Sequence, residues 1–315
     1  MKKILSSAYR FSSSWTGTII IVLFLIFFVA QSFVIPSGSM KRTQLIGDFL
    51  FAKKFSYGIP TPHLPWLEVP ILPDFNGNGH LIEGPRPQRE DIVIFRKPQT
   101  PKVHFVKRCV AVGGDELLYM DKRLLIHFHD LTTEAQIREK YPEAKLHRIR
   151  GKLWAENPYM GKYPGIQYAP ENFTAFEYLA MLYSNNKPID MYPVYLEELG
   201  ENAFYKKVEE DHYYMIGDNR DNSSDSRMWG SVAYKYIVGK PWLIYMSIEF
   251  RSYEEVLSGD LYGNGRDNAR LRRVCGDHPL ESAECEALWN DQRYTVRWGR
   301  IGRKIDTIQL EEPIE

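Results

Sequence analysis

The segment Val103–Val112, VHFVKRCVAV, sets two basic residues in the middle of a largely apolar run. This density of valine, phenylalanine and cysteine predicts a β-strand. Because side chains alternate between the faces of a strand, Lys107 and Arg108 point to opposite faces, each among apolar neighbours. One of the two is therefore either partly desolvated or at a strand edge. Burial disfavours the charged ammonium, so a desolvated Lys107 could act as a base, whereas an edge lysine would only discourage aggregation.

Other parts of the chain carry the same strand signature, and together they predict a mostly β protein. Runs rich in Val, Ile, Phe and Tyr, bounded by Gly, Pro or Asp, occur at 47–55, 91–95, 213–216, 237–248 and 294–301. Helical patterns are short and occur at 132–140 and 173–183. Residues 58–89 hold many prolines and several glycines, which predicts a long surface loop without regular structure.

The composition is that of a folded chain without a charge bias. The chain has 315 residues, of which 44% are hydrophobic, enough for a sizeable core. Lys+Arg and Asp+Glu both count 40, so no strongly basic surface argues for a nucleic-acid partner. The three cysteines are too few for a disulfide scaffold. Cys109 is expected to be a buried free thiol, while Cys275 and Cys285 could form a local disulfide or remain two free thiols.

The N-terminus carries the features of a membrane anchor. Residues 1–16 hold three basic side chains and no acid, and 18–30, TIIIVLFLIFFVA, carries no charge. With its flanks this run approaches the ~20 residues that span a lipid bilayer, so we predict a cytoplasmic tail at 1–16 and a single transmembrane helix at 17–35. A cleavable secretory signal is the alternative, because a basic start, a short apolar core and Ala30 before a polar residue are its ingredients. The bulky Phe28 argues against it.

Two further segments carry polar groups of the kind that form active sites. Pro36–Met40, PSGSM, follows the apolar run, and its proline and glycine favour a short exposed turn, although a Ser-Gly-Ser triplet alone is more often a linker. Gly217–Arg227, GDNRDNSSDSR, is dense in turn formers, acids and arginines. Because apolar residues flank it on both sides, we expect a partly buried network of hydrogen bonds and ion pairs rather than a solvated loop.

These three motifs, in this order behind an apolar N-terminal segment, resemble those of the type I signal peptidases, also called leader peptidases. The resemblance covers four stretches: 33–55, 90–115, 213–247 and, more weakly, 297–305. It implies a signal-peptidase-like β catalytic body with Ser39 as nucleophile and Lys107 as general base. A serine hydroxyl is a poor nucleophile at neutral pH and needs such a base within hydrogen-bond reach.

The resemblance also implies supporting roles. Ser37 would help to form the oxyanion hole with the backbone N–H of Ser39, and Ser223 would orient the lysine. The other supporting groups belong to the last motif, and they are Asp218, Asp225 and Arg227. None of the eight histidines lies in a matching motif, so an unrelated Ser-His-Asp triad is the weaker alternative.

The chain departs from the family's pattern at two places. After Met40 the family usually continues with a proline and a Thr-Leu pair, where this chain has 41–44, KRTQ. Before the next strand it usually has Arg-Gly-Asp, where this chain has Arg89, Glu90 and Asp91. Neither departure touches a residue with an implied catalytic role, so both bear on substrate preference more than on activity.

The element pattern and the resemblance together predict how the chain is divided. A catalytic β core would be formed by 36–116 and 211–250. Between these parts lies an inserted second region at 117–210, with no predicted catalytic residue. A C-terminal insertion at 251–290 and a final strand and tail at 291–315 would complete the chain.

The function that the resemblance implies is that of a membrane-bound serine endopeptidase that removes N-terminal signal peptides from exported preproteins. The expected location is the bacterial inner (plasma) membrane, with a single pass and an extracytoplasmic catalytic body; the orientation depends on the resemblance, since basic residues follow the anchor closely. Alternatives are a Ser/Lys protease specialised for one secreted substrate and a catalytically inactive homologue that binds peptides. No cofactor or metal is expected, because the chain has no glycine-rich phosphate loop and no zinc-type Cys/His spacing, and His127 and His129 have no evident third ligand.

Overall fold

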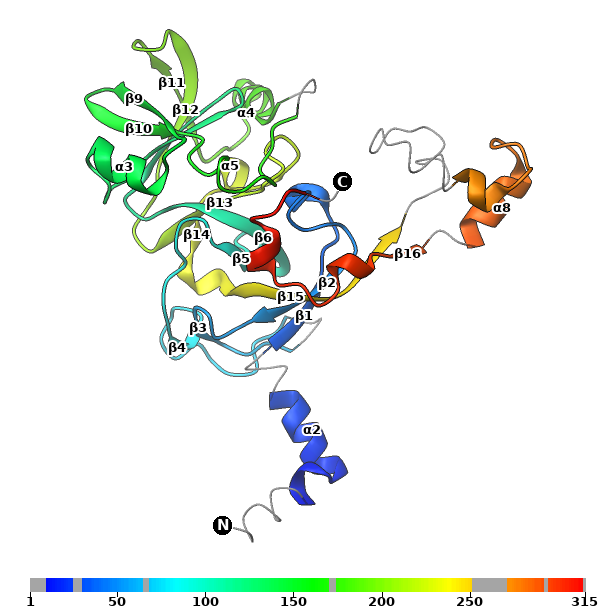
Figure 1. The fold of residues 1–315 in the computed structure, drawn as a ribbon. Helices are drawn as coiled ribbons and strands as arrows, with labels where there is room; N and C mark the ends of the chain where they lie inside the picture. Colours follow the sequence, from blue (N-terminus) through cyan, green and yellow to red (C-terminus); the bar gives the residue numbers. More distant parts are fainter. Residues whose placement is uncertain are drawn as a thin grey trace.

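The structure is a computed structural model, and it describes residues 10–24, 30–64, 68–169, 174–250, 271–291 and 294–313. Strands dominate, and they form an eight-stranded sheet, a six-stranded sheet and a two-stranded sheet. Figure 1 shows the two large sheets next to each other, the larger mainly in blue, cyan and yellow and the smaller in green. The predicted mostly β fold is confirmed.

The eight-stranded sheet carries or borders all three sequence motifs. Its order is β1-β2-β15-β5-β6-β13-β14, with β16 paired to β15, and its pairings are antiparallel. Its strands are β1 (Ala30–Val34), β2 (Asp48–Lys53), β5 (Ile92–Lys97), β6 (Thr100–Val112), β13 (His212–Ile216), β14 (Val232–Ala233), β15 (Ile237–Phe250) and β16 (Tyr294–Val296). The predicted strands are confirmed except that the last one, 294–301, ends early, because Trp298–Arg300 form the 3₁₀ turn η4.

Residues 116–207 build the six-stranded sheet and two helices, called here the second region. The sheet order is β11-β12-β7-β8-β10-β9. Its strands are β7 (Glu116–Met120), β8 (Arg123–His127), β9 (Lys145–Ile149), β10 (Lys152–Glu156), β11 (Tyr192–Leu196) and β12 (Glu201–Lys207). Helices α3 (Glu134–Lys140) and α4 (Ala175–Ser184) lie where helical patterns were predicted, and a threonine capping box begins each of them.

One buried apolar cluster joins the two large sheets. It includes Val110 and Tyr214 from the eight-stranded sheet and Leu117 and Phe204 from the six-stranded sheet. Because the sheets share this core, removal of the second region would expose apolar surface of the first. Cys109, next to Val110, is a buried free thiol as predicted.

The proline-rich stretch 58–89 is more regular than predicted. It contains a short antiparallel pair, β3 (Gly58–Pro60) and β4 (His80–Glu83). The ring of His80 stacks on that of Tyr234, with centroids 4.1 Å apart, and so ties the hairpin to the main body. The prediction of an irregular loop was wrong for Gly58–Pro60 and His80–Glu83, where such tertiary contacts override the local preference of proline and glycine, but the described residues between them form no helix or strand.

The predicted anchor at 17–35 does not continue as a helix to its expected end. Helix α2 covers Trp15–Phe24, whereas Ala30–Val34 form β1 and pair with β2. The predicted boundary at residue 35 is therefore wrong, since the backbone of the last anchor residues is bonded in a sheet. Residues 25–29 lie outside the described residues. Within the described part of the chain, no helix is long and apolar enough to cross a membrane.

The C-terminal insertion contains a small disulfide-linked lobe. The structure describes residues 271–291, including α8 (Ala283–Asp291), while 251–270 lie outside the described residues. Cys275 and Cys285 form a disulfide and are buried in a small apolar cluster of this lobe. Of the two alternatives that the sequence left open for these cysteines, the structure shows the bonded one.

Candidate active site

The motif 36–40 forms a turn after β1 that presents a serine and buries a methionine. Ser39 lies in the 3₁₀ turn η2 (Gly38–Met40) and is partly exposed. Met40 is 1% exposed and packs in an apolar cluster with Ile92. The buried methionine holds the turn against the sheet, so the serine hydroxyl has a defined position.

Lys107 of strand β6 faces this serine. Its Nζ lies 2.5 Å from the Oγ of Ser39, within hydrogen-bond distance. Only 4% of Lys107 is exposed. Burial lowers the pKa of Lys107 from its usual 10.5 to about 8, and the charges of Asp225 and Asp218 oppose this shift only in part. A substantial fraction of the amine is therefore neutral near pH 8 and able to accept a proton.

The loop after strand β13 holds the serine turn through backbone contacts. The N–H of Asn219 donates to the carbonyl of Ser39 and its side-chain amide donates to the carbonyl of Gly38, both at 3.1 Å. Gly217 permits this approach. A Cβ at that position would lie 2.5 Å from the carbonyl oxygen of Ser39 and 2.3 Å from the Oγ of Ser223.

Asp225 and Arg227 form a fully buried ion pair within this loop. Arg227 donates to both carboxylate oxygens of Asp225, at 2.8 Å each. Asp225 also accepts from the N–H of Gly217 at 3.1 Å and caps the short helix α5 (Ser226–Trp229). Burial alone would raise the pKa of Asp225, but the Arg227 guanidinium holds it below its usual value. The polar network expected for this motif is thus present.

Arg108 lies on the face of β6 opposite to Lys107 and pairs with Asp218. Its Nε and Nη2 donate to the two carboxylate oxygens at 2.8 Å each, and both residues are fully buried. Asp218 also accepts from the hydroxyl of Thr43 at 2.7 Å, which connects the loop to the segment after Ser39. Lys107 and Arg108 are thus both buried, and in the described structure only the arginine of these two has an ion pair.

Comparisons with known proteins place this chain in a family. The model of the family described as signal peptidase, peptidase S26, matches residues 9–246. The chain belongs to this family. Signal peptidase I of Helicobacter pylori strain J99 is 43% identical over 308 residues, 98% of this chain and 96% of that protein. The protein of the same name from strain 26695 is 49% identical over 255 residues, 81% of this chain and 88% of that protein.

More distant signal peptidases match less of the chain. Signal peptidase I of Pseudomonas aeruginosa is 31% identical over 248 residues, 76% of this chain and 72% of that protein. A crystal structure of a signal peptidase I from Enterococcus faecalis covers 50% of this chain and 97% of its own, with 21% identity and a TM-score of 0.25, too low to support a conclusion. Membership of the family makes the protein an enzyme, a serine endopeptidase of the signal peptidase class.

In this signal peptidase the other predicted site residues lie around Ser39 and Lys107. The Oγ of Ser37 is 3.5 Å from that of Ser39. Ser223 is 7% exposed and close enough to the Asp225 carboxylate to help to lower its pKa, yet its hydroxyl forms no hydrogen bond of standard geometry. Because the described residues show no bond between Ser223 and Lys107, its role in orienting the lysine stays a prediction.

A second buried cluster next to the serine turn was not predicted. Asp48, which is 0% exposed, accepts from Arg300 at 2.6 and 3.1 Å and from the hydroxyl of Ser247 at 2.6 Å. Arg300 also donates to the carbonyl of Thr43 at 3.2 Å. This cluster fixes the chain between the turn and strand β2. The signal available in the sequence was the weak resemblance at 297–305, which indicates no partner for its arginines.

The second region also reaches the site, although no catalytic residue was predicted there. Gln167 forms a parallel β-bridge with Asn219: its N–H donates to the carbonyl of Asp218 at 2.9 Å, and its carbonyl accepts from the N–H of Arg220 at 2.8 Å. Its side-chain oxygen accepts from Arg42 at 3.4 Å. The loop that holds the serine turn is therefore supported from the second region.

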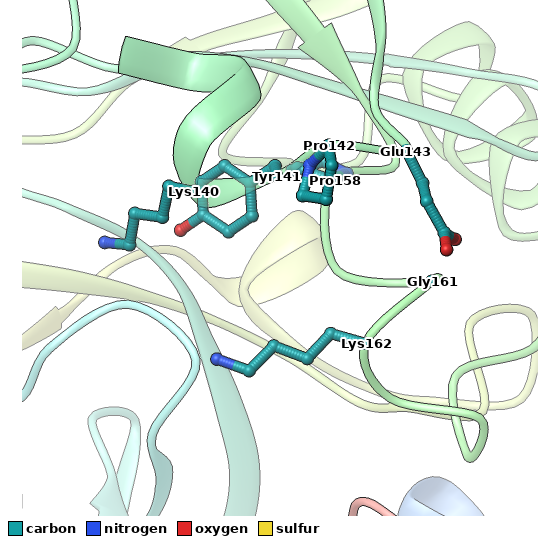
Figure 2. Close-up of a pocket in the computed structure, with 7 residues that line it drawn as sticks. All are labelled: Lys140, Tyr141, Pro142, Glu143, Pro158, Gly161 and Lys162. Atoms are coloured by element: carbon teal, nitrogen blue, oxygen red, sulfur yellow. The ribbon is translucent and has the colours of Figure 1, made fainter.

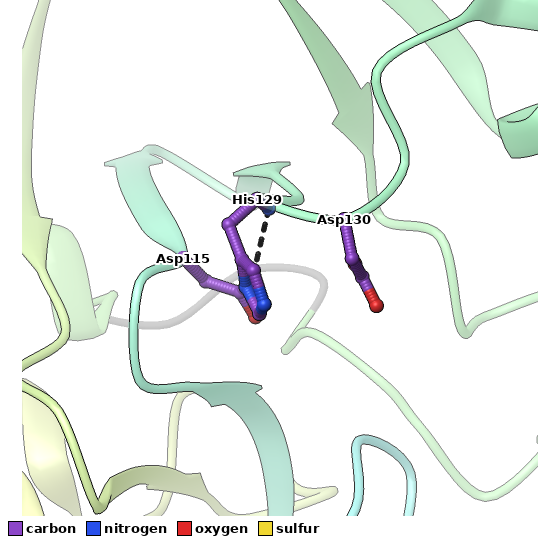
Figure 3. Close-up of side chains that lie close together, drawn as sticks. All are labelled: Asp115, His129 and Asp130. Atoms are coloured by element: carbon purple, nitrogen blue, oxygen red, sulfur yellow. Dashed lines mark hydrogen bonds and ion pairs between the residues drawn. The ribbon is translucent and has the colours of Figure 1, made fainter.

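A group of possible metal ligands lies elsewhere in the structure, at the end of the loop after β6 and after β8. Asp115, His129 and Asp130 are close enough for one atom of each to bind a common ion (Figure 3). Arg89, however, donates to Asp115 at 2.6 and 2.7 Å and to Asp130 at 3.0 Å. A cation would have to displace this guanidinium, which already pairs with both carboxylates. We therefore assign these residues to an ion-pair network.

Proposed function

We propose that Ser39 is the nucleophile of this signal peptidase and that Lys107 is its general base. The observation that carries the proposal is the 2.5 Å separation of the Lys107 Nζ and the Ser39 Oγ. A lysine serves as a base only when it is neutral. Burial supports that condition, because it lowers the pKa of this lysine to about 8.

In the proposed reaction, neutral Lys107 takes the proton of the Ser39 hydroxyl as its Oγ attacks the carbonyl carbon of the scissile bond. The resulting ammonium gives this proton to the leaving amine, which becomes the N-terminus of the mature protein. An ester between Ser39 and the signal peptide remains. The neutral amine then deprotonates a water molecule that attacks the ester, and the serine recovers its proton from the ammonium.

The oxyanion of both steps needs hydrogen-bond donors, and we assign the backbone N–H of Ser39 and the hydroxyl of Ser37 to this role. Ser37 is exposed and precedes η2, where its side chain caps no backbone N–H. Its hydroxyl is 3.5 Å from the nucleophile oxygen, so a substrate carbonyl bound to Ser39 would lie nearby. A donor of this kind contributes about 3 to 4 kcal/mol to transition-state stabilisation.

The proposed substrates are preproteins that carry an N-terminal signal peptide, the class implied by the name of the relatives. The pairing of β6 with β13 ends where Arg108 lies opposite Ile216. Residues 103–107 therefore have no β13 partner, and an extended peptide could add to the strand there, beside Lys107. The family resemblance implies small residues at the first and third positions before the cut, which shallow apolar pockets would select by size.

We also propose a single-pass anchor in the bacterial inner membrane, with the catalytic body on the extracytoplasmic side. The uncharged apolar run at 18–30 supports contact with lipid. The disulfide between Cys275 and Cys285 supports the orientation, because disulfides persist in oxidising compartments and are rare in the cytosol.

Preprotein cleavage by the detergent-solubilised full chain tests the dyad. We expect both Ser39→Ala and Lys107→Met to lower kcat by at least about 10³-fold, because each removes one of the two reacting groups. Lys145→Met, at an exposed lysine of β9, is the matched control and should cleave like the wild type. Full cleavage by either dyad variant would remove that residue from the mechanism. Failure of the wild type on several preproteins would favour the inactive, peptide-binding homologue.

A further inference from the structure

Glu90 replaces the glycine that is usual at this place in the family's pattern, yet its backbone keeps a conformation that suits glycine. Its φ is +79°, in the left-handed region that is unfavourable for residues other than glycine. A glutamate persists at such a position when the surrounding contacts determine its conformation.

The side-chain contacts of Glu90 come from the second region. Its carboxylate accepts from the hydroxyl of Tyr141 at 2.9 Å, from the hydroxyl of Tyr163 at 2.8 Å and from the Nζ of Lys162 at 2.6 Å. Figure 2 shows Tyr141 and Lys162 lining a small pocket with their polar ends pointing the same way. Burial alone would raise the pKa of Glu90, but these three donors lower it, so the carboxylate is ionised at neutral pH.

The backbone of Glu90 contacts strand β6 of the eight-stranded sheet. Its N–H donates to the carbonyl of Cys109 at 2.7 Å, and its carbonyl accepts from Nη1 of Arg108 at 2.8 Å. Arg108 also lies over the ring of Tyr163, 4.0 Å from its centroid, and pairs with Asp218. Because Asp218 belongs to the loop that holds the nucleophile turn, one chain of contacts runs from the second region to Ser39.

We propose that Glu90 is a positioning residue that couples the second region to the dyad through Arg108 and Asp218. The proposal rests on the proposed function, since it concerns the placement of Ser39 against Lys107. Without its side-chain carboxylate, Glu90 no longer has a fixed backbone position, so its carbonyl no longer holds Arg108 in place. The loop after strand β13, which Arg108 binds through Asp218, can then shift. A small misplacement of reacting groups slows the chemical step more than it weakens substrate binding.

Glu90→Gly isolates the side chain. Glycine accepts the left-handed backbone without strain and keeps the carbonyl, but removes the three side-chain hydrogen bonds. For preprotein cleavage well below the unfolding temperature, we expect kcat to fall about tenfold and KM to change by less than about twofold. A role confined to stability would lower the unfolding temperature and leave kcat unchanged, and that result would overturn the proposal.

Tyr163→Phe tests the same coupling by a change within the second region. It keeps the ring over Arg108 and removes only the hydroxyl that donates to Glu90. We expect kcat to fall about threefold, with no further loss when the change is added to Glu90→Gly, because both act through one contact. Additive losses would show independent effects and overturn the coupling. Glu134→Gln, in an exposed ion pair of α3, is the matched control and should leave kcat unchanged.

The dyad variants separate failure of this proposal from failure of the proposed function. If Ser39→Ala and Lys107→Met are inactive while Glu90→Gly cleaves like the wild type, only the positioning role is wrong. If either dyad variant cleaves normally, the dyad is wrong and the role of Glu90 is wrong with it.

Discussion

Strand β6 buries one basic side chain on each of its faces, and the pKa values of these two side chains are shifted in opposite directions. Burial lowers the pKa of Lys107 to about 8, because the nearby acids oppose the desolvation of its amine only in part. Burial would lower the pKa of Arg108 too, but the bonded carboxylate of Asp218 exceeds that effect and raises it. Lys107 and Arg108 thus differ in whether a carboxylate lies within hydrogen-bond distance of the side chain. In the proposed mechanism the amine of Lys107, which has no ion pair among the described residues, takes up a proton, whereas the paired guanidinium of Arg108 supports the structure.

The largest effect is expected from a substitution that makes the Lys107 face of β6 resemble the Arg108 face. Lys107→Arg would place a group there that cannot lose its proton in a protein. We expect kcat for preprotein cleavage to fall at least about 10³-fold, because the base is lost although the positive charge remains. Circular dichroism should show a folded protein. Cleavage near the wild-type rate would mean that the neutral amine is not needed.

The second-largest effect is expected when the ion pair on the Arg108 face is broken. Arg108→Met leaves Asp218 buried without its cation, and we expect the free energy of unfolding to fall by about 3 to 5 kcal/mol. Urea denaturation measures this change. Combining it with Asp218→Asn should recover part of the loss, since the uncompensated charge disappears. A loss below about 1 kcal/mol for the single change would show that the pair contributes little.

The third effect is a pH dependence that belongs to the Lys107 face. The active form of the lysine is neutral, and it becomes the major form as the pH rises through about 8. We therefore expect kcat/KM to rise about tenfold per pH unit below pH 8 and then to level off. The initial rate of cleavage between pH 6 and 9 measures the profile. A flat profile over this range would contradict the lysine as the titrating base.

The smallest effects are expected at Ser223, whose hydroxyl lies next to Gly217, as does the carbonyl of Ser39. Its buried hydroxyl forms no standard hydrogen bond in the described structure, so Ser223→Ala should change the free energy of unfolding by less than about 1 kcal/mol. We expect kcat to fall about tenfold, the size of effect of a residue that orients a reacting group. Steady-state cleavage kinetics measure it. An unchanged kcat would remove Ser223 from the site.

Local patterns of the sequence were sufficient for the elements that depend on near neighbours. The density of strand-forming residues in Val103–Val112 predicted strand β6, and the helices α3 and α4 formed where short helical patterns were predicted. Hydropathy was less informative at the N-terminus, because an apolar run suits a membrane helix and a buried strand alike. The run predicted as one helix to residue 35 therefore ends in strand β1, bonded to β2.

The sequence by itself determined the strand, the three polar motifs and the presence of Lys107 and Arg108 on opposite faces. Only the tertiary structure decided which of the two has an ion pair, because their partners are distant: Ser39 is 68 positions from Lys107, and Asp218 is 110 positions from Arg108. The contacts of Glu90 with the second region, and those of Gln167 in that region with the loop after strand β13, were equally beyond local patterns. A pKa depends on burial and on charges in space, and neither can be obtained from the order of residues along a strand.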